Sequence, residues 1–245
     1  MKCFLLLFPL FLFCNSYSQT CIIAKKTKDA IYVGAESRGI VPYYDPITKK
    51  TYKKPISNLC KIQSYGIFNF TVCGIGFPIA MDECKKAAKN QKSFTSVAKK
   101  YITSFSKRLR DTLESIRDDK FLSFLDIVKD IPQDSNRLGR TIFFGVEADT
   151  LFLGQIDFYL DSKFWEPVLI SVDAKVGNLF GGGHLNHIKD TIIKESTWAE
   201  GEVKTINALI KIEIMNDSLE VGGDIDIIKI TTRDKVWIQR KKICN

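Results

Sequence analysis

Residues 20–36 read TCIIAKKTKDAIYVGAE. Two short apolar runs, 21–24 and 30–34, lie on either side of the polar turn 27–29. Runs rich in β-branched residues around a polar turn are typical of a β-hairpin. We therefore expect two antiparallel strands at the start of the region that follows residue 19.

Residues 1–19 have the pattern of a secretory signal peptide. Lys2 precedes an apolar run from Cys3 to Cys14, and a small polar stretch follows up to Gln19. The run is much shorter than the roughly 20 residues that a membrane-spanning helix needs. We expect this segment to be removed, the protein to be exported without a membrane span, and residues 20–245 to form a single domain.

The small residues upstream leave the start of the mature chain open. Signal peptidase prefers small residues near the cleaved bond. Ser16 and Ser18 favour cleavage after Ser18, and Ser18 and Thr20 would occupy the same two positions for cleavage after Thr20. Trimming between these points would expose Thr20.

Strands and helices are expected in blocks rather than in strict alternation. We predict strands at 61–62, 66–73, 141–146, 150–157, 167–172, 225–231 and 236–239. We predict helices at 77–88, 93–113, 121–128, 184–194 and 198–215. Residues 39–58, rich in proline and lysine, are predicted to form an exposed loop or a ragged hairpin. Such blocks favour a layered α+β fold, in which helices cover antiparallel sheets, over a Rossmann fold.

The composition indicates an ordinary globular protein. Hydrophobic residues make up 45% of the 245 residues, which excludes a disordered or fibrous chain. The 36 basic residues exceed the 28 acidic ones by 8, but the surplus is spread along the chain. Because no motif combines basic and aromatic residues, nucleic acid is not an expected partner.

Cysteine and histidine supply little material for a metal site. Five cysteines follow residue 19, none in a Cys-x-x-Cys spacing, and their pairing is left open: Cys21, Cys60, Cys73, Cys84 and Cys244. His184 and His187 would share a helix face and could hold a metal if a carboxylate joined them. The favoured interpretation is two surface or capping residues after the glycine run 181–183, so no metal is predicted.

Thr20 lies where processing would expose a free α-amine directly before a strand. An N-terminal hydroxyl can use its own amine as general base, and the amine pKa of about 7.7–8.0 suits that task. Such a site needs no histidine.

The order of several motifs then resembles that of proteasome β-type subunits, members of the N-terminal nucleophile hydrolases. The residues that carry the resemblance are 20–24, 28–38, 61–62, 70–74, 216–218, 222–226 and 230–234. The resemblance implies an αββα fold, a four-layer sandwich of two antiparallel sheets between helix layers. It also implies self-association and a threonine hydrolase of peptides or small amides that needs no metal or cofactor.

The resemblance implies a role for each matching residue. Thr20 would be the nucleophile, Lys61 would lower the local potential, and Glu36 would hold Lys61. Asp217 and Ser218 would orient the amine. Backbone N–H groups near the glycine run would bind the oxyanion, with Gly181 and Gly182 as candidates.

Departures from the family pattern leave alternatives open. Gln19 precedes Thr20 where self-cleaving members have glycine, and Gly182 stands where the family usually has serine. The long segment between residues 36 and 61 makes Lys53 or Lys54 a competitor for the lysine role. Removal of Thr20 would make Cys21 the nucleophile of an N-terminal cysteine amidohydrolase, and a catalytically silent scaffold or binding protein is the third hypothesis.

Overall fold

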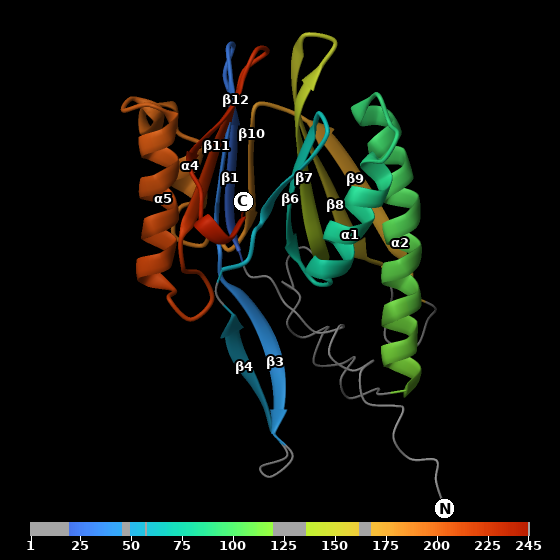
Figure 1. Cartoon of the computed structure of the whole chain (residues 1–245). Coiled ribbons are helices and arrows are strands. Elements are labelled where there is room, and N and C mark those ends of the chain that lie inside the picture. The colour runs from blue at the N-terminus through green and yellow to red at the C-terminus, as the bar shows by residue number, and fades with distance from the viewer. Residues whose placement is uncertain (1–19, 46–49, 57, 120–135, 162–167, 245) are drawn as a thin grey trace, which may run out of the picture.

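The computed structural model describes residues 20–45, 50–56, 58–119, 136–161 and 168–244. In these ranges the chain forms three antiparallel sheets, with helices packed against the two larger ones (Figure 1). The predicted signal peptide and the predicted helix at 121–128 lie outside the described residues.

The first sheet contains the predicted hairpin. Its strand order is β10-β1-β2-β11-β12, and all neighbours are antiparallel. The strands are β1 (Cys21–Lys26), β2 (Ile31–Glu36), β10 (Leu179–Gly183), β11 (Ile225–Ile230) and β12 (Lys235–Gln239). In the turn between β1 and β2, the Thr27 amide donates a hydrogen bond of 2.8 Å to the Ala30 carbonyl. The hairpin expected from residues 20–36 is confirmed.

Strand β1 begins with a continuous apolar run because both of its faces are buried. Ile22 and Ala24 join the core that also contains Ile142 and Phe144 of the second sheet. Cys21 and Ile23 join a separate core beneath helix α5 (Glu202–Asn216). Because alternate side chains of a strand point to opposite faces, a slip of one residue would exchange the two sets.

The second sheet has the order β5-β6-β7-β8-β9 and is also antiparallel. Its strands are β5 (Ile62–Tyr65), β6 (Phe68–Gly74), β7 (Arg137–Glu147), β8 (Thr150–Leu160) and β9 (Ile170–Val176). Helices α1 (Phe77–Ala88) and α2 (Phe94–Asp119) share a core with this sheet. In that core Tyr101 of α2 stacks against Phe105 and meets Phe158 of β8 edge-on.

The first sheet is covered by α5, whose Ile206 and Ile210 pack on β1 and β2. The short helix α4 (Lys189–Ile192) and the 3-10 turn η2 (Glu195–Trp198) complete that core. Among the described residues no helix has the length and apolar character needed to cross a membrane.

The expected four-layer αββα sandwich of two antiparallel sheets is wrong. The described residues form three antiparallel sheets with 12 strands and only four α-helices, one of them a single turn. The third sheet pairs β3 (Gly39–Asp45) with β4 (Lys50–Ile56) and projects away from the other two (Figure 1). The hairpin alternative expected for residues 39–58 is thus confirmed, since in a two-stranded sheet every strand is an edge, where proline is tolerated.

The helix predicted at 184–194 is also wrong for most of its length. Residues 179–183 form β10, and only 189–192 are α-helical. Gly182 pairs with Ile22, and a β-carbon added to it would lie 2.9 Å from Cys73 Sγ of the second sheet. The glycines therefore allow β10 to approach the second sheet closely. The sequence pattern of three glycines does not reveal this role, because it is equally typical of a turn.

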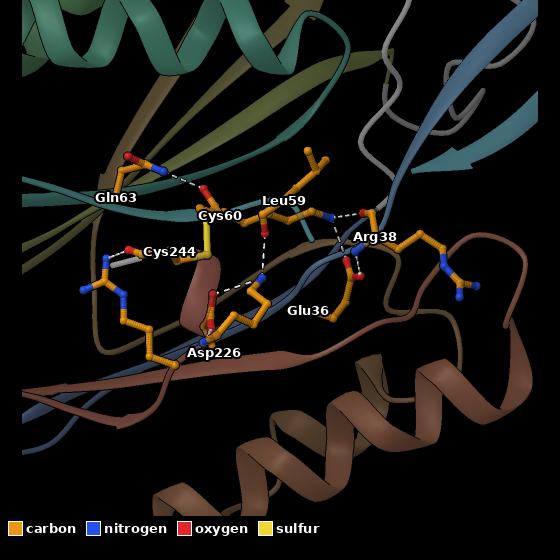
Figure 2. A network of polar contacts seen from close by, with 10 residues as sticks. Glu36, Arg38, Leu59, Cys60, Gln63, Asp226 and Cys244 are labelled. Atoms are coloured by element: carbon orange, nitrogen blue, oxygen red, sulfur yellow. Dashed lines mark hydrogen bonds and ion pairs between the residues drawn. A yellow bond between two sulfur atoms is a disulfide. The ribbon is translucent and has the colours of Figure 1, made fainter. Parts of the chain in front are cut away.

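A disulfide joins the C-terminal segment to the residue before Lys61 (Figure 2). Cys60 and Cys244 are bonded, whereas the other described cysteines are free and buried. Beside the disulfide, Lys241 Nζ donates to the Leu59 carbonyl over 2.6 Å and pairs with Asp226 Oδ2 over 3.0 Å. The C-terminal segment is thus held against the chain that leads into β5.

Replacing Cys60 and Cys244 together by Ser is expected to lower the free energy of unfolding by about 2–5 kcal/mol, because the cross-link restricts the unfolded chain. Urea unfolding with and without a reductant measures the effect. The reductant should lower the wild-type midpoint and leave that of the double variant unchanged. A wild-type midpoint that does not respond to reductant would contradict the prediction.

Candidate functional site

The carboxylate of Glu36 at the end of β2 collects four hydrogen-bond donors. Oε1 accepts from Lys61 Nζ over 2.7 Å and from the Cys21 amide over 3.3 Å. Oε2 accepts from the amides of Arg38 and Gly222 over 2.5 and 3.1 Å. Glu36 is completely buried, and a buried carboxylate is tolerated only when its lone pairs are satisfied in this way. Glu36 therefore joins the start of β1, the end of β2 and the segment before β11.

Lys61 lies directly before β5 and is also completely buried. Its Nζ contacts Thr20 Oγ1, Glu36 Oε1 and the Arg38 carbonyl. An ammonium group has three donors, and these contacts use all of them. Burial lowers the pKa of Lys61, while the charge and hydrogen bond of Glu36 oppose that shift.

Thr20 directly precedes β1 and is completely buried. Its carbonyl accepts a 2.7 Å hydrogen bond from the His184 amide. Gly183 makes this approach possible: its φ is 77°, and a β-carbon there would lie 1.5 Å from the Thr20 carbonyl oxygen. The His184 amide holds the Thr20 carbonyl and Glu36 holds the Cys21 amide, so the backbone at the start of β1 is fixed where the Thr20 hydroxyl contacts Lys61.

Asp217 and Ser218, predicted to orient the amine, lie beside this group. Asp217 Oδ2 lies 2.9 Å from His184 Nε2, and the His184 amide in turn binds the Thr20 carbonyl. Ser218 contributes its carbonyl, which accepts from the Arg38 guanidinium. The sequence predicted a surface or capping role for His184; its place directly after the glycine run is the signal that could have indicated its proximity to Thr20.

The glycines predicted to supply the oxyanion donors lie further along the sheet. Gly182 pairs with Ile22 and Gly181 with Ile23, two and three residues beyond Thr20. The described contacts do not bring either one to the Thr20 hydroxyl, and their role stays a prediction.

Of the competing lysines, Lys54 is exposed on β4 of the third sheet, and the Lys53 side chain lies outside the described residues. It is Lys61 that the structure brings to Thr20 and Glu36.

The thiol of Cys21 lies on the opposite face of β1 from the Thr20 hydroxyl. Cys21 packs under α5 with Ile23 and Leu209, and burial raises the pKa of its thiol well above the ordinary value. A thiol is nucleophilic as the thiolate, which this environment disfavours. The geometry therefore favours Thr20 over Cys21 as the residue that Lys61 serves.

The arrangement is suited to activating a hydroxyl. A cationic nitrogen beside Thr20 Oγ1 would stabilise the alkoxide that forms when the hydroxyl loses its proton. Exclusion of water strengthens this electrostatic effect. In the chain as it is synthesised, the Thr20 nitrogen is an amide bonded to Gln19, so it becomes a base only after cleavage between these residues.

The lowered pKa of Lys61 predicts a dependence of stability on pH. Between the lowered value and the ordinary 10.5, the unfolded chain holds a proton that the folded protein releases. The free energy of unfolding should therefore gain a positive contribution as pH rises through this window. Urea unfolding across the alkaline range should show a smaller slope for Glu36→Gln/Lys61→Met than for the wild type. Lys54→Met, at an exposed position, is the matched control, and equal slopes for all three proteins would refute the prediction.

An apolar groove of about 420 Å³ lies between α2 and strands β8 and β9. Its lining includes Phe94 and Ile102 of α2 and Phe152 of β8. It lies where α2 meets the second sheet, whereas Thr20 directly precedes β1 of the first sheet, so this groove is not part of the candidate site.

Comparison with known proteins finds no family model and no curated protein that matches this chain. The case for an activity therefore rests on the residues and geometry of the site.

Proposed function

We propose that this protein is an N-terminal threonine hydrolase that cleaves peptide or other amide bonds. The observation that carries the proposal is the contact of Lys61 Nζ with Thr20 Oγ1 while the same nitrogen is held by Glu36. The three side chains are completely buried, and they come from separate places in the sequence. Few purely structural roles require a lysine to be buried against a threonine hydroxyl, because burial of the ammonium is costly.

In the proposed reaction, Thr20 Oγ attacks the carbonyl carbon of the amide while its hydroxyl proton passes to the free α-amine of the same residue. The tetrahedral intermediate collapses, the C–N bond breaks, and the departing amine takes that proton. Water then attacks the resulting ester while the α-amine removes a proton from it; the bond between the acyl carbon and Thr20 Oγ breaks, and the amine returns that proton to Oγ. The products are a carboxylic acid and an amine, and Thr20 is regenerated.

Lys61 and Glu36 are unchanged at the end of this cycle. Lys61 stabilises the negative charge that develops on Thr20 Oγ, and Glu36 orients Lys61 by a charge-assisted hydrogen bond. Asp217 and His184 support the Thr20 backbone from the other side. No step requires a metal or cofactor.

The proposal requires processing before Thr20. Cleavage of the Gln19–Thr20 bond supplies the amine, and the complete burial of Thr20 means that its surroundings must open before a substrate reaches it. Export through the N-terminal segment is the natural occasion for this cleavage. The Cys60–Cys244 disulfide supports export, since disulfides persist mainly in oxidising compartments.

We extend the proposal to short peptides or small amides as substrates and to self-association of the chain. Nucleic acid is not a proposed partner.

The test is to determine the N-terminal sequence and intact mass of the exported protein and then to treat it with an epoxyketone peptide. This electrophile reacts with a hydroxyl and an amine on the same residue, so one adduct per chain is expected at Thr20. The Thr20→Val variant, which keeps the shape but lacks the hydroxyl, is the control and should not react. A chain that begins at Thr20 but forms no adduct would favour the scaffold hypothesis.

A further inference from the structure

Glu213 of α5 is a second buried carboxylate, and the proposed reaction does not use it. It is completely buried, and its Oε1 accepts from the amides of His187 and Ile188 over 2.8 and 3.1 Å. Its Oε2 is buried and has no hydrogen-bond partner among the described residues. A buried carboxylate oxygen without a donor is costly, so this oxygen is available to a partner from outside the described residues.

Two histidine side chains lie near this carboxylate. One ligand atom each from His184, His187 and Glu213 can be chosen so that all three lie within 4.8 Å of one another. His184 and His187 lie in the segment after β10, whereas Glu213 comes from the last part of α5. The carboxylate that the two histidines would need for a metal site is therefore supplied by a distant helix.

We propose that His184, His187 and Glu213 bind one Zn²⁺ ion. Two imidazoles and a carboxylate, with water at the fourth position, form a ligand set that zinc accepts, whereas Mg²⁺ and Ca²⁺ prefer oxygen ligands. Bonds of about 2.0–2.1 Å place tetrahedral ligands about 3.3 Å apart, so the side chains need to close by roughly 1.5 Å at most. His187 is exposed and can make this movement.

The surroundings of His184 match those of a metal-binding histidine. Its Nε2 lies 2.9 Å from Asp217 Oδ2 and 3.0 Å from Asn186 Nδ2. In the tautomer with the proton on Nε2, this nitrogen donates to Asp217 and Nδ1 is the nitrogen that can bind metal. Glu220 Oε2 lies 3.6 Å from Nδ1 and adds negative charge. Because the His184 amide binds the Thr20 carbonyl, the ion would order the segment that holds Thr20.

The site is tested by titrating the metal-free full-length protein with zinc chloride in a calorimeter. We expect one ion per chain and an increase in the thermal unfolding midpoint, with no comparable response to magnesium chloride. The Glu213→Gln variant keeps an oxygen for the two amides but loses the carboxylate, and His187→Asn changes an exposed side chain. Each should weaken zinc binding by more than the roughly 10- to 100-fold that follows loss of an outer-shell partner.

The matched control is Glu200→Gln, which removes an exposed carboxylate just before α5 and should bind zinc like the wild type. Zinc binding that is equal in the wild type, Glu213→Gln and His187→Asn would overturn the proposal. So would a wild-type protein that binds no zinc at micromolar concentration. Neither readout depends on hydrolase activity, so this proposal and the proposed function fail independently.

Discussion

Replacing Lys61 by Met is expected to lower kcat/KM about 10³-fold, or about 4 kcal/mol of transition-state stabilisation, because one preorganised cationic donor to Thr20 Oγ1 is lost. The measurement is hydrolysis of a fluorogenic peptide amide by protein whose N-terminus has been sequenced. Lys54→Met, on the exposed face of β4, should retain wild-type kcat/KM and is the matched control.

A second variant separates loss of catalysis from loss of the fold. Lys61→Met alone leaves the buried Glu36 carboxylate without its cation, which costs about 3–5 kcal/mol of stability when a buried pair is broken. Glu36→Gln/Lys61→Met removes both charges and should unfold at a higher midpoint than the single variant. Its kcat/KM should be no lower than that of the single variant, since residues that act as a unit are not additive. A folded double variant that keeps wild-type activity would remove Lys61 from the site.

A chain that begins at Gln19 is expected to show no measurable turnover, whereas a chain that begins at Thr20 hydrolyses the amide. The single extra residue converts the α-amine into an amide, which cannot accept the hydroxyl proton. We expect a loss of at least about 10³-fold, comparable with removal of a general base at the upper part of its usual range. Both forms can be released from a fusion protein by a protease that leaves a defined N-terminus.

The two forms should have equal thermal unfolding midpoints, which shows that the difference lies in the amine. A third form that begins at Cys21 tests the cysteine alternative. It should be inactive, because the Cys21 side chain packs beneath α5 on the opposite face of β1 from Lys61. Equal turnover by the Gln19 and Thr20 forms would refute the amine as general base, and turnover by the Cys21 form would transfer the role to its thiol.

Sequence patterns predicted local structure best where burial and hydrogen bonding are local. The hairpin at 20–36 and helices near 77–88 and 93–113 have apolar spacing that matches their own period, and the structure contains them. The helix predicted at 184–194 was wrong for most of its length, because the preceding glycines 181–183 lie in β10 and contact residues of other strands, and no local period records such contacts. For residues 39–58 the sequence left a loop and a ragged hairpin open, and the structure contains the hairpin β3–β4, because a two-stranded sheet tolerates prolines that a larger sheet excludes.

The site was only partly accessible from the sequence. The resemblance selected Thr20, Glu36 and Lys61, which are separated by 16 and 25 residues along the chain, and the structure brings their side chains together. It did not select His184, whose amide binds the Thr20 carbonyl, because that contact depends on where β10 ends. Glu213 could not be found either, since its burial depends on how α5 packs.

The sequence by itself determined the hairpin of β1 and β2, the apolar faces of the main helices, and the position of Thr20 directly before a strand, on which the predicted processing rests. These follow from side-chain alternation and from position, which need no knowledge of distant residues. Only the tertiary structure decided that the described residues form three sheets, that Cys60 pairs with Cys244, and that a lysine is buried against Thr20. The physical reason is that burial, disulfide bonding and charge pairing depend on which distant segments pack together, and packing is a property of the whole fold.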